Sequence, residues 1–249
     1  MAARDVGYKL VAGTANPKLC QAIAGYLRQP LCRWTTRQFT DGEIFVQGEE
    51  NLRGADVFVI QPTSPPVNDN LMELLIIIDA LKRASADRIT AVVPYYGYAR
   101  QEKKDGPREP ITARLVADMI EVAGAHRLVT IDLHAGAIQG FFNIPIDHLT
   151  CLYMVADHFR RAGLENSIVV APDTGRAKAA EKLANALELD LAALTTQSNA
   201  ATRSSGAQTT STSGHGANAA ASAAATAGFV SARIRRSGSM RSISGRTMA

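Results

Sequence analysis

The sequence predicts an α/β fold in which parallel strands are flanked by helices. Short apolar runs alternate with longer helical patterns over residues 8–194, and this alternation is typical of repeated βαβ units. The apolar content of 46% and the charged content of 20% are ordinary for a globular protein. A chain of 249 residues is long enough for one large domain or two small ones.

The expected elements follow one another at short spacing. Apolar runs predict strands at residues 8–12, 57–60, 89–93, 128–133, 168–171 and 189–194. Helical patterns lie between them, at residues 17–27, 68–84, 111–122, 150–162 and 175–187. Asn16 is expected to cap the first helix through its side-chain oxygen, and Pro17 suits the first helical position. The helix at 68–84 is apolar on most faces, so we expect it to be buried.

The composition changes sharply after Asp190, which is the last acidic residue of the chain. Residues 191–249 consist mainly of Ala, Ser, Thr and Gly with scattered Arg. With few large apolar side chains, residues 196–249 cannot bury enough surface to offset chain entropy, so we expect a low-complexity, disordered tail. Six arginines in this tail account for the net charge of +4, and no specific nucleic-acid partner is expected because no folded basic face is implied.

The cysteines and the apolar segments bear on cellular location. Cys20, Cys32 and Cys151 have no ligand-like spacing and are expected to be free thiols in a reducing compartment. The first ten residues contain no apolar signal core, and the longest apolar run, at residues 74–78, is far too short to cross a bilayer. The sequence therefore predicts a cytoplasmic protein with no membrane partner.

Polar residues gather where three predicted strands end, and ligands of parallel sheets lie beyond this edge. Asp132 and His134 are two residues apart at the end of one predicted strand, so they are expected to point to one face. The histidine could ligate a metal or bind a phosphate, or it could simply be satisfied by neighbouring backbone. Asp173 lies between a strand and a helix, where a carboxylate suits a hydrated Mg²⁺ but is equally suited to capping the helix.

Two further segments carry groups suited to a nucleotide. The loop at residues 95–104 is aromatic and basic, and Arg100 could grip a phosphate with its planar fork; the alternative is a solvated loop with its tyrosines packed at the root. In the turn at residues 39–43, Asp41 and Glu43 could accept hydrogen bonds from an adenine amino group or a ribose hydroxyl. A plain hairpin turn is the commoner meaning of Asp-Gly.

Four segments together resemble one family closely, the ribose-phosphate diphosphokinases, also called phosphoribosyl pyrophosphate synthetases. These segments are FTDGEIFVQGEENLRGADVFVIQPT, VVPYYGYARQEKKDGPREPITARLVADMI, TIDLHAGAIQGFFNIPIDHL and VVAPDTGRAKAAEKLA. The resemblance implies two phosphoribosyltransferase-like domains with parallel sheets: a first domain at residues 1–145, the start of a second, truncated domain at 146–195, and the tail at 196–249. It also implies transfer of diphosphate from Mg-ATP to the 1-hydroxyl of ribose 5-phosphate, with release of AMP.

The same resemblance assigns site residues by their positions in the matching segments. Asp41 and Glu43 match the adenine-binding turn, and Arg100 and Gln101 match the ATP-contacting pair of the family's flexible flag loop. His134 and Asp173 match the residues of the magnesium site. The family builds its ATP site between subunits, so the resemblance implies a homo-oligomer based on dimers, with a hexamer as one form.

The chain departs from the family pattern after residue 194. Thr196 and Ser198 occupy the positions of the family's catalytic Lys and a nearby Arg, and no acidic loop for the ribose phosphate follows. We therefore expect no catalytic cation at these positions and an impaired enzyme. The alternative is a non-catalytic, regulatory or structural homologue that oligomerises with intact subunits. A phosphoribosyltransferase is disfavoured because that family also depends on the acidic loop.

Overall fold

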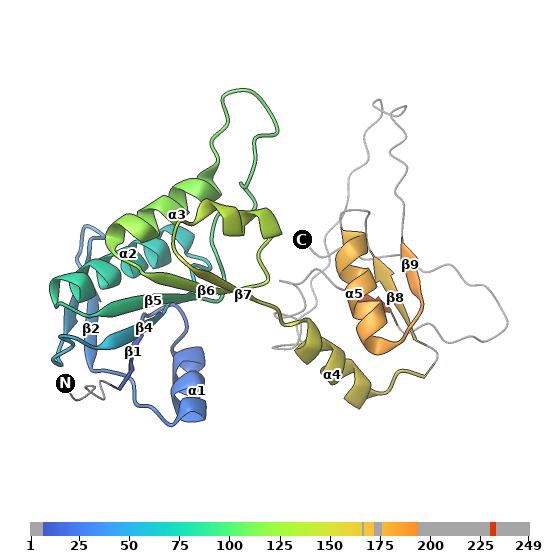
Figure 1. Cartoon of the computed structure of the whole chain (residues 1–249), viewed down its shortest axis with the longest axis horizontal. Helices are drawn as coiled ribbons and strands as arrows, with labels where there is room; N and C mark the ends of the chain where they lie inside the picture. Colours follow the sequence, from blue (N-terminus) through green and yellow to red (C-terminus); the bar gives the residue numbers. More distant parts are fainter. Residues whose placement is uncertain (1–6, 166, 172–175, 194–229, 233–249) are drawn as a thin grey trace, which may run out of the picture. The chain divides into compact units, whose positions relative to one another are not determined.

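The computed structural model describes residues 7–165, 167–171, 176–193 and 230–232 of the chain (Figure 1). The chain forms two compact units that divide between Thr150 and Cys151. The first unit contains most of the described elements and all the candidate site residues except Asp173, Thr196 and Ser198, which lie outside the described residues.

A five-stranded parallel sheet forms the centre of the first unit. Its strand order is β1-β4-β5-β6-β7, with every neighbouring pair parallel. The strands are β1 (Lys9–Ala12), β4 (Asp56–Ile60), β5 (Arg88–Val93), β6 (Arg127–Ile131) and β7 (Ile146–Leu149). The predicted α/β class with a parallel sheet is therefore confirmed.

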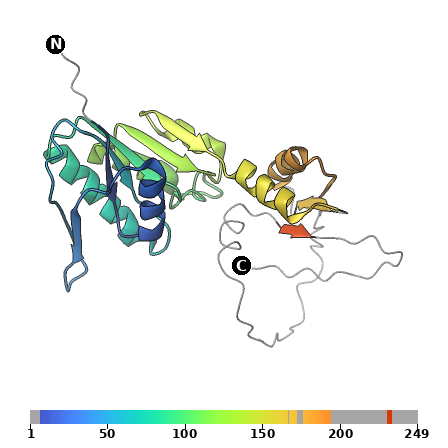
Figure 2. The same ribbon diagram turned by 90° about the horizontal axis from the view of Figure 1, so that it is seen from below.

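Helices cover both faces of this sheet. Helix α1 (Pro17–Leu27) lies on one face, and α2 (Val67–Arg83) and α3 (Thr112–Ala123) lie on the other (Figures 1 and 2). Asn16 caps α1 as expected, because its side-chain oxygen accepts a hydrogen bond from the Leu19 N–H at 3.1 Å. Pro17 is the first residue of the helix, where its missing N–H costs nothing.

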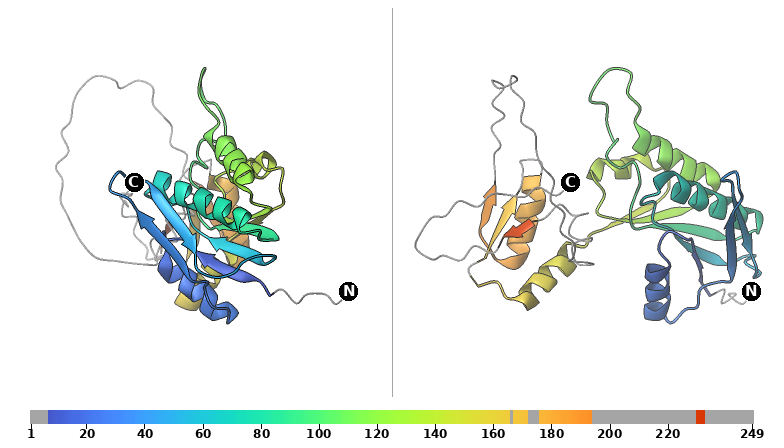
Figure 3. Two further views of the ribbon diagram at one scale, coloured as in Figure 1. Left: turned by 90° about the vertical axis from the view of Figure 1, so that its left-hand side faces the viewer. Right: turned by 180° about the vertical axis from the view of Figure 1, so that it is seen from behind.

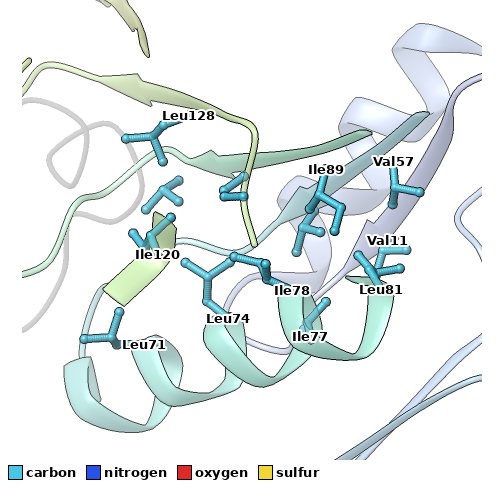
Figure 4. Close-up of a cluster of buried hydrophobic side chains, with 14 of the residues drawn as sticks. Val11, Val57, Leu71, Leu74, Ile77, Ile78, Leu81, Ile89, Ile120 and Leu128 are labelled. Carbon is cyan, nitrogen blue, oxygen red and sulfur yellow. The ribbon is translucent and has the colours of Figure 1, made fainter. Parts of the chain in front are cut away.

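The core of the first unit lies between α2, α3 and the sheet. Leu74, Ile77, Ile78 and Leu81 project from α2 toward the strands and are fully buried (Figure 4). They pack with apolar residues from the sheet and from α3: Val11, Val57, Ile89, Ile120 and Leu128. The predicted burial of this helix is confirmed, and burying each such side chain contributes about 1.5–3 kcal/mol.

A β-hairpin stands apart from the main sheet. Strand β2 (Trp34–Gln38) pairs antiparallel with β3 (Ile44–Gly48), and β3 lies against α2. The apolar patterning did not predict these two strands, because both are largely half-buried or exposed and neither has a continuous apolar face. The turn between them carries Asp41 and Glu43. The interpretation of Asp-Gly as a hairpin turn is therefore confirmed.

The first unit is longer than the expected first domain of residues 1–145. Strand β7 pairs with β6 and completes the first sheet, so the division falls after Thr150. The sequence of β7 mixes apolar and polar residues, which is why no strand was expected there. Helix α4 (Leu152–Ala162) accordingly begins two residues later than expected.

In its described residues, the second unit has a small three-stranded sheet and two helices. Strand β8 (Ile168–Ala171) pairs in parallel with β9 (Leu191–Ala193), and α4 and α5 (Ala177–Leu187) contribute to a compact apolar cluster. Strand β10 (Val230–Ala232) pairs antiparallel with β8, contrary to the expectation that residues 196–249 contain no regular structure. The remainder of that expected tail lies outside the described residues.

Neither the described helices nor any window within them is long and apolar enough to pass through a membrane. This finding agrees with the short apolar runs noted in the sequence.

Two buried cysteines provide a test of the packing of the first unit. Cys20 and Cys32 form no disulfide, and burial raises the pKa of both thiols. Because the thiolate is the reactive species, iodoacetamide should label both at least about tenfold more slowly in the native chain than in guanidinium. Mass spectrometry of timed digests would measure the two rates, and equal rates would contradict the burial.

Candidate functional site

The carboxyl ends of β5 and β6 bring two of the predicted polar segments to one edge of the sheet. The two strands are neighbours and parallel, so the loop after Val93 and the loop after Ile131 leave the sheet at the same edge (Figure 1). This edge is where parallel sheets of this class hold their ligands.

The loop after β5 is anchored tightly at its root. The Thr63 hydroxyl donates to the Tyr95 carbonyl at 3.0 Å and accepts from the Gly97 N–H at 2.7 Å. A Cβ atom at Gly97 would lie 2.8 Å from Val67 Cγ1 and 2.9 Å from the Thr63 carbonyl oxygen, so only glycine permits this approach. The root of the loop is therefore a fixed part of the sheet edge.

The tyrosines of this segment are used for structure. Tyr96 is buried, and its hydroxyl donates to the Ala113 carbonyl at 2.9 Å. Burial raises the pKa of Tyr96, so the hydroxyl stays protonated and keeps this donor. Tyr98 takes a left-handed φ of 63° and hydrogen-bonds Asn68 through its hydroxyl. The packing of tyrosines at the loop root, one of the two alternatives, is confirmed for Tyr96.

Arg100 and Gln101 follow this anchored root. The Gln101 N–H donates to the Tyr98 carbonyl at 2.9 Å, and the Gln101 carbonyl accepts from the Ala113 N–H at 3.2 Å. Arg100 is exposed, and no carboxylate of the described residues lies within ion-pair distance of it. An exposed guanidinium on a fixed backbone is suited to binding a phosphate group.

Strand β6 ends two residues earlier than expected, so the loop after it begins at Asp132. Asp132 has a φ of 45°, which is a left-handed conformation that a strand cannot continue through, so β6 ends at Ile131. Asp132 accepts a hydrogen bond from the Thr150 hydroxyl at 2.8 Å, and its N–H donates to the Leu149 carbonyl. The expectation that Asp132 and His134 share the face of one strand is wrong.

His134 lies in this loop with an exposed side chain. The neighbouring Leu133 N–H donates to His148 Nε2 at 2.9 Å, so β7 holds the loop in place. The structure therefore puts His134 at the ligand edge of the sheet. Its predicted role in a metal site stays a prediction.

The described residues do not by themselves make a magnesium site. They contain no group of three His, Cys, Asp or Glu side chains close enough to share a metal ion. His134 offers a nitrogen ligand, whereas Mg²⁺ prefers oxygen, and Asp173 lies outside the described residues. Magnesium that is bound to the phosphates of a nucleotide needs only one or two protein ligands. Such a magnesium ion would enter the site as part of the substrate.

The hairpin turn presents its two acidic side chains to solvent. The Phe39 N–H donates to the Glu43 carbonyl at 2.8 Å, and the Glu43 N–H donates to Asp41 Oδ1 at 3.1 Å. Gly42 has a φ of 94°, which the turn requires and which glycine alone adopts without strain. The turn is thus closed by its own hydrogen bonds, and both carboxylates remain exposed.

An arginine packs beside this turn. The guanidinium carbon of Arg37 lies 4.3 Å from the centre of the Phe45 ring and 5.4 Å from that of Phe39. Arg37 and Phe45 are cross-strand partners, so the contact joins the two strands next to the turn. This stabilising contact was not predicted from the sequence, because the pairing of the two strands brings Arg37 to Phe45.

Two segments with opposite charge lie apart within the unit. They are the acidic turn, which carries Asp41 and Glu43, and the basic loop root, which is the start of the loop after β5 and includes Arg100 and Gln101. The hairpin lies at one end of the first unit, and the loop that follows β5 rises at the other (Figures 1 and 3). Within the described residues, no hydrogen bond or ion pair joins the hairpin turn to this loop.

Comparisons with known proteins match the same part of the chain. A sequence model described as the N-terminal domain of ribose phosphate pyrophosphokinase matches residues 8–124. The chain is 54% identical over 185 residues to the ribose-phosphate pyrophosphokinase of Wolinella succinogenes, and 56% identical over 185 residues to that of Maricaulis maris. Each match covers 74% of this chain and 60% of the relative.

A solved structure is similar to this chain in both fold and sequence. The crystal structure of phosphoribosylpyrophosphate synthetase from Mycobacterium smegmatis aligns with a TM-score of 0.75 and 46% sequence identity. This alignment covers 77% of this chain and 65% of the other. The chain spans about 60% of the length of the curated relatives it matches. Over residues 8–124 the chain is therefore similar to the N-terminal domain of the ribose-phosphate pyrophosphokinases.

Proposed function

We propose that the first unit binds the MgATP of a ribose-phosphate diphosphokinase reaction. In that reaction, diphosphate passes from MgATP to the 1-hydroxyl of ribose 5-phosphate, giving phosphoribosyl pyrophosphate for nucleotide biosynthesis and AMP. The observation that carries the proposal is that the family match over residues 8–124 contains both the acidic turn and the basic loop root. Both segments are fixed by their own backbone hydrogen bonds and expose their charged groups.

The proposed roles follow from the chemistry of the exposed groups. Asp41 and Glu43 accept hydrogen bonds from the adenine amino group or the ribose, and Arg100 and Gln101 bind the phosphates. His134 and Asp173 are proposed to support the magnesium of MgATP. Magnesium, when bound, neutralises charge on the phosphates.

The separation of the two segments favours a homo-oligomer. A nucleotide that touches both the acidic turn and the loop root needs the turn of one copy and the loop of another, because one copy holds them at opposite ends (Figure 1). This supports the proposed dimer-based assembly, which the resemblance extends to a hexamer.

A second candidate function is a non-catalytic subunit that assembles with intact homologues. The observation that favours it is the lack of any acidic residue after Asp190, together with Thr196 and Ser198 at the positions of the family's cations. The ligand-edge groups of the first unit would then bind nucleotide for regulation or assembly. Co-purification with an intact relative would distinguish this function from independent catalysis.

Nucleotide binding tests the proposal directly. Trp34 is the only tryptophan and belongs to the hairpin, so it can transfer excitation energy to a fluorescent N-methylanthraniloyl ATP analogue. With Mg²⁺ present, Arg100→Ala should weaken Kd by about tenfold or more, because a charge-assisted hydrogen bond is lost.

The matched control is Arg83→Ala, which removes an exposed arginine of α2 that pairs with Asp79. It should change Kd by less than about twofold, since a surface ion pair contributes little. Equal effects of the two substitutions, or no binding of the analogue by the unmodified chain, would contradict the proposed ATP site.

A further inference from the structure

The Gln101 side chain is held by Thr112, which is not among the proposed nucleotide-binding residues. The Thr112 hydroxyl donates a hydrogen bond to the side-chain oxygen of Gln101. Thr112 is the first residue of α3, and the next residue, Ala113, binds the Gln101 carbonyl. Backbone and side chain of Gln101 are therefore both attached to the start of α3.

This contact determines which end of the Gln101 amide already has a partner within the chain. An amide has an oxygen that only accepts and a nitrogen that carries two N–H donors. The Thr112 hydroxyl donates to the amide oxygen of this exposed side chain, and no described residue accepts from the amide nitrogen, so its two N–H donors are available to a ligand. Next to them is Arg100, whose guanidinium also only donates. The neighbouring pair thus presents donors alone, which suits an anionic phosphate chain.

We infer that Thr112 is a positioning residue for the phosphates of the nucleotide. Its hydroxyl holds the Gln101 amide with the N–H donors available, so that Gln101 acts together with Arg100 on a polyphosphate. This inference rests on the proposed ATP site. Without the hydroxyl, the amide is free to turn, and its oxygen would repel a phosphate whenever it faced the ligand.

The structure also distinguishes this role from a general one in stability. Thr112 is half-buried and its hydroxyl makes one contact with an exposed side chain, whereas the loop closure depends on backbone hydrogen bonds of Gln101. Replacing the hydroxyl by a methyl group keeps the β-branched shape and these backbone bonds. The substitution Thr112→Val is therefore expected to affect phosphate binding more than folding.

The test compares nucleotides that share a base but differ in phosphate number. With the full chain and Mg²⁺, energy transfer from Trp34 would give Kd for the N-methylanthraniloyl forms of ATP and AMP. Thr112→Val should weaken binding of the ATP form about fivefold, the loss expected for one poorly set hydrogen bond, and change binding of the AMP form by less than about twofold. Thr112→Ser keeps the hydroxyl and should restore binding of the ATP form.

A matched control is Thr35→Val, which removes a hydroxyl that donates to Glu49 on the hairpin, away from the loop. It should leave the ratio of the two dissociation constants unchanged. An unchanged ratio for Thr112→Val, or equal weakening of both nucleotides, would overturn the inference while leaving the ATP site in place. Failure of the unmodified chain to bind the ATP form would overturn the proposed function and this inference with it.

Discussion

Replacing Glu73 by alanine should lower the free energy of unfolding by about 3 kcal/mol or more. Glu73 lies on the inner face of α2 with 3% of its surface exposed. Its carboxylate accepts from the Thr14 N–H at 3.0 Å, the Thr14 hydroxyl at 2.6 Å and Gln61 Nε2 at 2.7 Å. Each donor left without an acceptor in the interior costs about 1–3 kcal/mol, so the loss of the carboxylate affects three groups at once.

The position of these groups explains why the effect is large. Thr14 lies in the loop between β1 and α1, and Gln61 follows β4, the neighbouring strand. Gln61 also accepts from the Ala15 N–H at 3.1 Å, so the network joins α2 to the start of α1 across the sheet edge. No basic side chain of the described residues lies within ion-pair distance of Glu73, and the carboxylate is satisfied by these hydrogen bonds alone.

Chemical denaturation followed by Trp34 fluorescence would measure the change, and a loss of this size corresponds to a Tm decrease of roughly 2–4 °C for each kcal/mol. Asp79→Ala on the same helix is the matched control, because Asp79 is an exposed carboxylate paired with Arg83. It should cost less than about 1 kcal/mol. Equal losses for the two variants would show that the buried network does not stabilise the unit.

The network also shows what patterning could and could not predict. Helix α1 was predicted with its correct bounds, because Asn16 and Pro17 are local signals that act within one turn. The core face of α2 was foreseen from its apolar residues, but the partners of Glu73 were not, because Thr14 and Gln61 are 59 and 12 residues away along the chain. A single Glu within an otherwise apolar stretch is the sequence signal that points to such a network.

The candidate site was predicted in part for the same reason. Arg100 and His134 follow strands, so the rule that ligands bind beyond strand ends was enough to put them at the sheet edge. The orientation of Gln101 depends on Thr112, eleven residues away across a loop, and periodicity carries no such information. The distance between the acidic turn and the loop root depends on where the hairpin packs, which is a tertiary contact with α2.

The largest functional effect is expected for turnover. Purified chain should release AMP from MgATP and ribose 5-phosphate at least about 10³-fold more slowly than the Wolinella succinogenes relative assayed in parallel. Phosphoryl transfer depends on cations that stabilise transition-state charge, and loss of one such cation costs about 10³- to 10⁵-fold in rate. The prediction rests on the resemblance, which puts Thr196 and Ser198 at the positions of a Lys and an Arg, and on the lack of any acidic residue after Asp190 to align the ribose phosphate.

A chimera separates a missing acceptor site from a defective nucleotide site. Replacing residues 195–249 by the corresponding carboxyl-terminal segment of the Wolinella relative should restore AMP release, because the proposed ATP-binding residues of the first unit are unchanged. Adding Arg100→Ala to the chimera should reduce the restored rate again, since the phosphates then lose a cation. Turnover by the unmodified chain within about tenfold of the relative would contradict the expected impairment. A chimera that binds the ATP analogue yet stays inactive would instead place the defect within the first 194 residues.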